Sequence, residues 1–395
     1  MEGLKIFFWI CFLVIAYSYL GYGILLYVIV RIKRLVKPVQ KDAAAGLFMP
    51  DVTLVVSAYN EEAFIRKKIE NTFALDYPPG RLKIIFITDG SDDRTPEIIS
   101  GYSMIQLLHQ PRRQGKVAAM NRALGYVTTP YIIFCDANTL LNRDCIKEIV
   151  RHYADPAVGG VAGEKRVLQT DSTHAAEAGE GLYWKYESWL KTLDSELYSV
   201  VGAAGELFSV RKDLFEPTRE DIIIEDFVQS LKICMKGYLV RYEPNAYASE
   251  SSSESMRDEQ KRKVRISAGA FQAMVELKAL FNVFRYPILS FQFISHRILR
   301  WTLCPLCLVL LLPLNVLLVV FGEPGIYSYL LVAQGAFYAV SITGWILASR
   351  NIKVKALYVP YYFLFMNISV FMGFKRYLKK QQSVLWEKAS RQKLA

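Results

Sequence analysis

Four long apolar runs, one near the start of the chain and three near its end, constrain most strongly how this sequence can fold. Residues 6–30 (IFFWICFLVIAYSYLGYGILLYVIV) contain no charged side chain and are long enough to cross about 30 Å of hydrocarbon. No small-residue cleavage site follows a short apolar core, so we expect an uncleaved N-terminal transmembrane anchor at residues 1–37 rather than a signal peptide. The basic stretch RIKRLVK follows at 31–37, and such stretches favour the cytoplasmic side. The next segment is therefore predicted to be cytoplasmic.

The other three runs predict three further transmembrane helices within residues 301–378, at 301–321, 326–348 and 357–374. The segment 281–300 mixes aromatic, basic and histidine side chains, which is typical of an amphipathic helix lying in the membrane interface. Four spans would return the C-terminus to the side of the N-terminus, whereas the basic tail at 379–395 favours the cytoplasm. The sequence leaves the side of this tail open.

Several polar residues lie inside the predicted spans, where such groups usually face protein or water. They could line a polar path through the membrane, or they could bond one helix to another, and the second explanation is at least as well supported. The residues concerned are Asn315, Gln334, Ser341, Thr343 and Asn367.

Composition agrees with a membrane protein. Hydrophobic residues make up 52% of the chain, which excludes a disordered protein, and the formal net charge is +11. The positive charge next to predicted membrane segments indicates attraction to anionic membrane lipids, and we expect no nucleic-acid partner. Six scattered cysteines fit a reducing cytoplasmic setting.

Between the anchor and the interface helix, short apolar runs alternate with amphipathic segments. Four runs have the character of strands, at 51–60, 82–90, 104–110 and 131–138, and the intervening segments at 61–75, 93–100, 115–127 and 144–154 have that of helices. Such alternation predicts a mostly parallel sheet with helices on both faces. We therefore expect a cytoplasmic α/β domain at residues 51–280, joined to the anchor by a linker at 38–50.

Polar clusters follow three of the predicted strands, where ligands bind in sheets of this kind. They are Tyr59-Asn60-Glu61, Asp89-Gly90-Ser91-Asp92 and Asp136-Ala137-Asn138. In the last cluster, two oxygen-bearing side chains two residues apart on an extended segment point the same way, which suits a hard divalent cation. A helix cap would also explain Asp136. Three clusters on one sheet edge favour a shared site.

A series of short motifs in this order resembles the family 2 inverting glycosyltransferases of GT-A fold. The motifs are SAYNEE (57–62), TDGSDD (88–93), QGKVAAMN (114–121), DAN (136–138), IEDF (224–227) and RKVRISAG (262–269). Together with the flanking spans, they are similar to membrane polysaccharide synthases of the hyaluronan, chitin-oligosaccharide and poly-N-acetylglucosamine kind. The resemblance implies a Rossmann-like, mixed but mostly parallel GT-A sheet with flanking transmembrane helices.

The resemblance also assigns residues to the donor. Asp136 and Asn138 would bind Mg²⁺ or Mn²⁺, although the family usually has a second Asp at the place of Asn138. Asp89 resembles the carboxylate that recognises the uracil edge. Ala58, through its backbone, and Glu61 would contact the nucleoside.

Two further residues would act near the diphosphate and the acceptor. Lys116 resembles the lysine that contacts the nucleotide, although a first-turn surface lysine is the alternative. Asp226 matches the family's catalytic base, which removes the proton of the acceptor hydroxyl. Neighbouring Glu225 and partial burial would raise the pKa of Asp226. An N-cap for the following helix is the alternative for Asp226.

The last motif departs from the family pattern Gln-x-x-Arg-Trp. Arg262 and Arg265 are expected to bind the nucleotide-sugar, with Arg265 at the position that holds the diphosphate. Ile266 stands where the family has the acceptor-stacking Trp. A basic stripe on the membrane surface is the alternative for this segment. Trp184 and Trp189 could also line an acceptor groove, although aromatic residues at helical spacing more often pack.

The sequence thus predicts an integral membrane glycosyltransferase. The resemblance implies a protein of the bacterial inner membrane with a cytoplasmic catalytic domain. It would transfer a hexose or N-acetylhexosamine from a UDP-sugar of the UDP-GlcNAc or UDP-Glc type to a growing polysaccharide, metal-dependently and coupled to export. Its partners would be the donor, a carbohydrate or glycolipid acceptor and membrane lipids, and an oligomer is compatible with the sequence. Two alternatives stay open: single-sugar transfer to a polyprenyl phosphate or other lipid carrier, and an inactive structural partner of an export complex.

Overall fold

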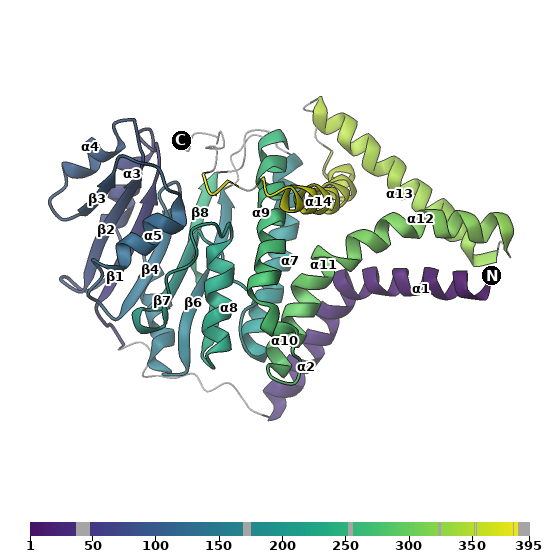
Figure 1. Ribbon diagram of the computed structural model, residues 1–395, viewed down its shortest axis with the longest axis horizontal. Coiled ribbons are helices and arrows are strands. Elements are labelled where there is room, and N and C mark those ends of the chain that lie inside the picture. The colour runs from purple at the N-terminus through teal and green to yellow at the C-terminus, as the bar shows by residue number, and fades with distance from the viewer. Residues whose placement is uncertain are drawn as a thin grey trace.

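An eight-stranded mixed sheet forms the centre of the computed structural model, in the order β3-β2-β1-β4-β7-β6-β8-β5 (Figure 1). The structure describes residues 1–36, 48–168, 175–251, 256–322, 325–350, 352, 354–381 and 383–385. Most of the predicted linker at 38–50 and of the basic tail at 379–395 lies outside these residues.

The predicted α/β alternation is confirmed in the first half of the sheet. Strands β1 (Val52–Ala58), β2 (Leu82–Asp89), β3 (Gln106–Gln110) and β4 (Tyr131–Asp136) are mutually parallel. Strand β7 (Leu207–Arg211) then runs antiparallel to β4 and to β6 (Val158–Leu168). Strand β8 (Leu239–Ser251) is parallel to β6, and the short β5 (Leu140–Leu141) closes the far edge.

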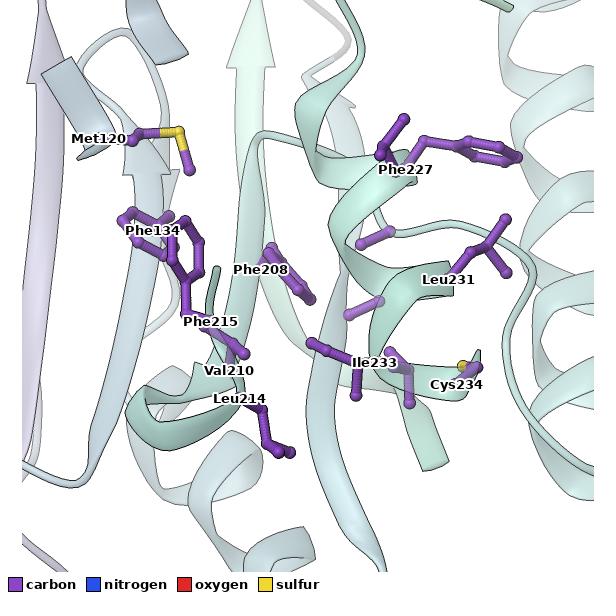
Figure 2. Packing of buried hydrophobic residues seen from close by; sticks show 14 of the residues in the cluster. Met120, Phe134, Phe208, Val210, Leu214, Phe215, Phe227, Leu231, Ile233 and Cys234 are labelled. Carbon is purple, nitrogen blue, oxygen red and sulfur yellow. The ribbon is translucent and has the colours of Figure 1, made fainter. Parts of the chain in front are cut away.

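Helices cover both faces of the sheet, as Figure 1 shows. Helices α3 (Ile65–Phe73), α4 (Thr95–Ser100) and α6 (Cys145–Val150), the last continued by a 3-10 turn at Arg151–Ala154, pack on one face. Helices α5 (Lys116–Leu124) and α8 (Glu225–Met235) pack on the other. Figure 2 shows that Ile233 of α8 points toward Phe208 of β7, whereas Phe227, Leu231 and Cys234 lie on the side of α8 facing away from these strands.

The N-terminal anchor is longer than the predicted run. Helices α1 (Glu2–Ala16) and α2 (Tyr22–Val36) are joined by a π-helical turn at Tyr17–Gly21 into one helix of 35 residues. Four helices are long and apolar enough to cross a membrane: Glu2–Val36, Leu303–Phe321, Gly325–Ser349 and Ala356–Leu378. The last three correspond to α12, α13 (Gly325–Ser349) and α14 (Lys355–Leu378).

The polar residues of the spans bond mainly within and between helices. Asn315 Nδ2 donates to Gln334 Oε1 at 3.2 Å, which joins α12 to α13. Ser341 donates back to a carbonyl one turn earlier on α13. The helix-bonding explanation therefore accounts for Asn315, Gln334 and Ser341, whereas Asn367 lines a cavity.

The segment predicted as an interface helix at 281–300 differs in its bounds and surroundings. The helix comprises α10 (Pro287–Phe293), a π-turn at Ile294–Ile298 and α11 (Leu299–Trp301), after a 3-10 turn at Lys278–Phe281. Residues 282–286 are not helical, because the residue before a proline avoids the α conformation and Pro287 starts the helix. Gln292 and His296 are fully buried, so this helix turns its polar face inward, onto protein.

Helix α14 lies along α9 (Met256–Glu276) rather than standing free. The hydroxyl of Tyr358 donates to the Met256 sulfur at one end, at 3.1 Å. At the other end, the rings of Phe374 and Phe271 lie 4.8 Å apart. Figure 1 shows α14 end-on beside α9, while α12 and α13 extend away from the sheet.

Candidate active site

The ends of β1, β2 and β4 meet at one edge of the sheet, as predicted. Ser57 is in register with Asp136, and Ala58 with Thr88, so Ala58, Asp89 and Asp136 all end their strands there. The loops that follow are tied together by hydrogen bonds. The Glu61 amide donates to Thr95 Oγ1 at 2.8 Å. Asn60 also donates to Ser91 and Asp92, so the polar clusters after β1 and β2 are joined to each other.

A loop before α5 closes over the end of β2. Asp89 Oδ2 accepts hydrogen bonds from the backbone amides of Gln114 (2.9 Å) and Gly115 (2.6 Å). Gly115 adopts φ +101°, a conformation that residues with a Cβ rarely adopt. The other oxygen, Asp89 Oδ1, is buried and bonds to none of the described residues. This free acceptor suits the donor groups on the edge of a nucleobase. Nearby, the Arg113 guanidinium lies over the Tyr59 ring, 3.6 Å from its centroid.

Lys116 stands at the centre of an acidic cluster. Its Nζ lies 2.8 Å from Asp136 Oδ1 and 3.2 Å from Glu225 Oε1, and it donates to the Gly205 carbonyl at 3.2 Å. Burial lowers the pKa of Lys116, but the carboxylates of Asp136, Glu225 and Asp226 together hold it well above its ordinary value. Lys116 is thus no surface lysine.

Asp226 lies in the first turn of α8, next to this cluster. Burial, and then the charge of Glu225, raise the pKa of Asp226 to about 7. The helix begins at Glu225, and Ile224 at the N-cap forms no side-chain cap bond, so Asp226 is not the cap. Its neighbour Phe227 packs so closely on Gly202 (φ +88°) that a Cβ at Gly202 would meet the ring at 2.0 Å. This contact holds the first turn of α8, which carries Asp226, against the loop before β7.

The two arginines of the RKVRI segment have different surroundings. Arg265 faces the cavity described below, and burial lowers its pKa. Arg262 also lines the cavity, but its guanidinium pairs with Glu259 at 3.0 Å and with Glu250 at 3.4 Å. In this structure Arg262 is thus part of a buried ion-pair cluster.

A cavity of about 540 Å³ extends from Asp136 and Asp226 toward the membrane helices. Trp184 and Ile266 line it, and their role in binding an acceptor stays a prediction. Trp189 does not, and this prediction needs correcting. Five residues along a helix turn the side chain by about 140°, so Trp189 faces away from the cavity. It packs on Tyr186 and Tyr27 and keeps 40% of its surface exposed.

Sequence reasoning missed several residues of this cavity. Trp301 lines it and lies 5.3 Å from the Phe227 ring, so an aromatic side chain is present although Ile266 replaces the family's Trp. Glu187 accepts from Arg297 Nη1 at 3.0 Å and Arg300 Nη1 at 2.5 Å. The basic residues at 297 and 300 were visible in the sequence, but their buried acidic partner on α7 (Ala175–Leu197) was not.

The oxygen atoms near Asp136 fit a metal cation that is held jointly by the protein and a bound ligand. Among the residues that the structure describes, no three His, Cys, Asp or Glu side chains form a group that could hold a metal ion. Asp136 is an oxygen donor at the sheet edge, and Asn138 follows in the turn after β4 without lining the cavity. Mg²⁺ commonly takes one or two carboxylates plus substrate phosphates. A divalent cation is therefore compatible with this site together with a diphosphate.

Part of the chain matches a known sequence family. Residues 53–218 match the Glycosyl transferase family 2 sequence family. These residues form a family 2 glycosyltransferase domain. The glycosyltransferase domain includes Asp89, Lys116 and Asp136, whereas Asp226 and Arg265 lie beyond the matched range. Their assignment rests on the resemblance of the motifs and on the geometry.

Curated relatives of the glycosyltransferase domain are polysaccharide synthases. The chain is 25% identical over 258 residues to the poly-beta-1,6-N-acetyl-D-glucosamine synthase of Staphylococcus aureus (strain COL), covering 61% of this chain and 60% of the relative. It is 24% identical over 235 residues to the enzyme of that name from Staphylococcus epidermidis, covering 57% and 55%. The chain thus spans about 60% of the length of these relatives.

The fold extends over nearly the whole chain. The mannosyltransferase PcManGT from Pyrobaculum calidifontis, solved with GDP-Man and Mn²⁺, aligns with a TM-score of 0.71 and 22% identity. The alignment covers 95% of this chain and 99% of that one. The predicted GT-A fold is confirmed.

Proposed function

We propose that the chain is a membrane-bound inverting glycosyltransferase that transfers a sugar from a nucleoside-diphosphate donor to an acceptor reached from the membrane side. The observation that carries this proposal is the position of Asp226. A carboxyl group with a pKa of about 7 lies beside Lys116, where the strand ends open into the cavity. A base with such a pKa is suited to proton transfer at neutral pH.

The donor would lie across the strand ends. Asp89 would accept from the nucleobase through its free oxygen, and Ala58 and Glu61 would border the nucleoside. We propose a UDP-sugar of the UDP-GlcNAc or UDP-Glc type, because the similar synthases are named for N-acetyl-D-glucosamine. The similar mannosyltransferase was solved with GDP-Man, so a guanine donor is the alternative to test.

Asp136, with Asn138, would hold Mg²⁺ or Mn²⁺ together with the donor. Such a cation neutralises the charge that develops on the leaving diphosphate. Arg265 would contribute positive charge beside the diphosphate, and Lys116 would exchange its carboxylate partners for phosphate oxygens. We propose no donor contact for Arg262, because it is paired with Glu250 and Glu259.

The chemical step would proceed by inversion. The acceptor hydroxyl oxygen bonds to the anomeric carbon from the face opposite the diphosphate, whose bond to that carbon breaks. The hydroxyl proton passes to Asp226. Trp184, Trp301 and Ile266 would form the apolar wall against the acceptor, since flat aromatic faces cover sugar rings well.

The acceptor is proposed to be a growing polysaccharide, coupled to export, by analogy with the synthases. A second candidate, transfer of one sugar to a lipid carrier, is favoured by one observation. Tyr19 of the anchor and Phe363, Met366 and Val370 of α14 line the cavity, so an apolar chain could approach along membrane helices. The presence of Lys116, Asp136 and Asp226 together argues against an inactive structural partner.

We also propose a membrane arrangement that differs from four crossings. If α14 crossed the bilayer, α9 beside it would enter the hydrocarbon, yet seven of the nine residues at 257–265 are charged. Each would cost about 3 kcal/mol or more at the bilayer centre. The anchor, α12 and α13 would therefore cross a bacterial inner membrane, and α14 would lie in its interface. Three crossings place the basic tail in the cytoplasm with the catalytic domain, which removes the conflict in the sequence.

The experiment uses the purified full-length protein in detergent with a panel of UDP- and GDP-sugars and Mg²⁺ or Mn²⁺, and measures nucleotide release. Release from one donor, abolished by EDTA, supports the proposal, and no release from any donor contradicts it. The acceptor is tested in sealed vesicles with radiolabelled donor outside. Lumen-protected label of high molecular weight supports a polymer, whereas a short product extractable into organic solvent supports the lipid carrier.

A further inference from the structure

The membrane-side part of the cavity carries more positive than negative charge. The whole wall has eight Lys or Arg side chains and five carboxylates. The membrane-side part is the wall formed by Glu187, Lys191, Arg297 and Arg300. Its carboxylate, Glu187, already forms ion pairs with Arg297 and Arg300. His296 bridges Glu187 at 3.3 Å and Asp194 at 2.6 Å. Lys191 also lines the cavity, and none of these bonds neutralises its positive charge.

Lys191 is 4% exposed and forms no hydrogen bond or ion pair with any residue in the described part of the chain. Its Nζ lies over two rings, 5.8 Å from the Trp184 centroid and 5.6 Å from that of Tyr242. Burial and then the charge of Arg297 lower its pKa, and the charges of Glu164, Glu187 and Glu206 offset this only in part. A buried, unpaired ammonium is costly unless it has a partner. Because Lys191 lines the cavity, an anionic ligand can supply that partner.

Arg300 offers a second donor in the same place. Its Nε donates to the Ser18 carbonyl at 3.0 Å and its Nη1 to Glu187. Its Nη2 is buried and bonds to none of the described residues. The side chain is 10% exposed and borders the cavity. A guanidinium with a free N–H and an unpaired ammonium that line the same cavity match the oxygens of a phosphate.

These groups lie near Asp226 but apart from it. Arg297 Nε donates to the Val201 carbonyl at 3.2 Å, at one end of the loop before β7. Lys116 bonds the Gly205 carbonyl at the other end of this loop. Four residues span at most about 14 Å, which sets the scale of the separation. The two ends of the loop are at most this far apart, and Gly202 and Gly205 both line the cavity, so one ligand in it can approach groups at both ends.

We propose that Lys191, Arg297 and Arg300 bind a phosphate of the acceptor, and that the acceptor is a lipid-linked sugar phosphate. Its hydroxyl reaches Asp226, its phosphate occupies this subsite, and its tail leaves between the anchor and α14, past Tyr19 and Met366. This deepens the second candidate of the proposed function, an acceptor carried on a lipid, and rests on the proposed function for the transfer step. In that step the hydroxyl oxygen gains the anomeric carbon, the donor loses its nucleoside diphosphate, Asp226 takes the proton and the acceptor phosphate is unchanged.

Binding without donor tests the subsite independently of transfer. The probes are farnesyl phosphate and farnesol, which share one tail, with inorganic phosphate as the tailless reference. Affinity for the full-length protein in detergent is measured by calorimetry. We expect farnesyl phosphate to bind at least about tenfold more tightly than farnesol and than inorganic phosphate. Equal binding of farnesyl phosphate and farnesol would overturn the subsite. Equal binding of inorganic and farnesyl phosphate would overturn the lipid part.

The variant Lys191→Met removes the charge without leaving a buried carboxylate unpaired, so it is expected to fold. It should abolish the preference for farnesyl phosphate, whereas Lys185→Met, at an exposed position of the same helix, should retain it. An unchanged preference in Lys191→Met would also overturn the proposal. Nucleotide release is assayed separately, so its absence, with the preference intact, would reject the glycosyltransferase activity and not the phosphate subsite.

Discussion

The ammonium of Lys116 and the carboxylate of Asp136 lie 2.8 Å apart, where the start of α5 meets the end of β4. The same ammonium reaches Glu225, on a helix more than 100 residues further along the chain. Lys116 thus compensates several buried carboxylates in the absence of a donor. When a donor and a cation bind, that compensation becomes available to the diphosphate.

Replacing Lys116 should therefore destabilise the protein unless a cation is supplied. We expect Lys116→Met to cost about 3 kcal/mol or more, because it leaves buried carboxylates without their partner. Mn²⁺ should restore part of the loss. Thermal unfolding in detergent, with and without Mn²⁺, measures both effects, and Lys185→Met is the control. Equal midpoints for Lys116→Met and the wild type in both conditions would contradict this account.

Mn²⁺ binding should depend on the nucleotide, since no dedicated metal cage exists among the described residues. We expect UDP (or GDP, if the donor panel favours it) to increase Mn²⁺ affinity by about tenfold or more. Asp136→Ala should remove this gain, and Asn138→Asp should strengthen binding by adding a second carboxylate. Calorimetry with and without nucleotide tests the three proteins. Tight Mn²⁺ binding to the nucleotide-free protein would count against the assignment.

The rate of transfer should fall on the acidic side of neutrality. Asp226 must be ionised to accept a proton, and its raised pKa of about 7 means that lowering the pH through 7 protonates it. Glu225 and Glu206 raise this pKa and Lys116 lowers it, so Glu225→Gln should shift the acidic limb to lower pH. The exposed Glu220→Gln is the control. If the acidic limb of the pH–rate profile does not move in Glu225→Gln, that limb reports a group other than Asp226.

The chain segment after α14 should lie on the same side of the membrane as the catalytic domain. A Ser383→Cys variant in oriented vesicles should react with an impermeant maleimide from the side that labels Lys83→Cys, on β2. A Gly3→Cys variant should react from the opposite side. The six native cysteines are buried, which limits background labelling. Labelling of Ser383→Cys together with Gly3→Cys would instead support four crossings.

The sequence predicted the first half of the sheet because its strands are apolar runs that end on polar residues. Strands β6 and β8 escaped prediction. Their sequences, VGGVAGEKRVL and LVRYEPNAYASES, contain glycines, a proline and many polar residues, so neither shows a clear apolar run or alternation. Several of these polar side chains are buried because they pair in the fold: Lys165 of β6 bonds Glu250 of β8.

The donor side of the site was predictable for a similar reason, since each residue follows a strand in a short motif. The acceptor side was not. Glu187 and Lys191 come from α7, and Arg297 and Arg300 from the segment before α12, more than 100 residues away. Their pairing depends on tertiary packing. Trp189 shows that neighbours in the sequence can also be separated by the fold. It belongs to the same aromatic cluster as Trp184, but the two side chains lie on different faces of one helix.

The most direct test of the central claim is to compare the wild type with Asp226→Asn in donor binding and in transfer. The amide keeps the size of the side chain but cannot accept the proton. We predict unchanged donor affinity and a rate of transfer lower by about 10²–10⁴-fold, the usual contribution of a general base. Asp221→Asn, exposed in the loop just before α8, should behave as the wild type. A transfer rate in Asp226→Asn equal to that of the wild type would contradict the role of Asp226 as the catalytic base.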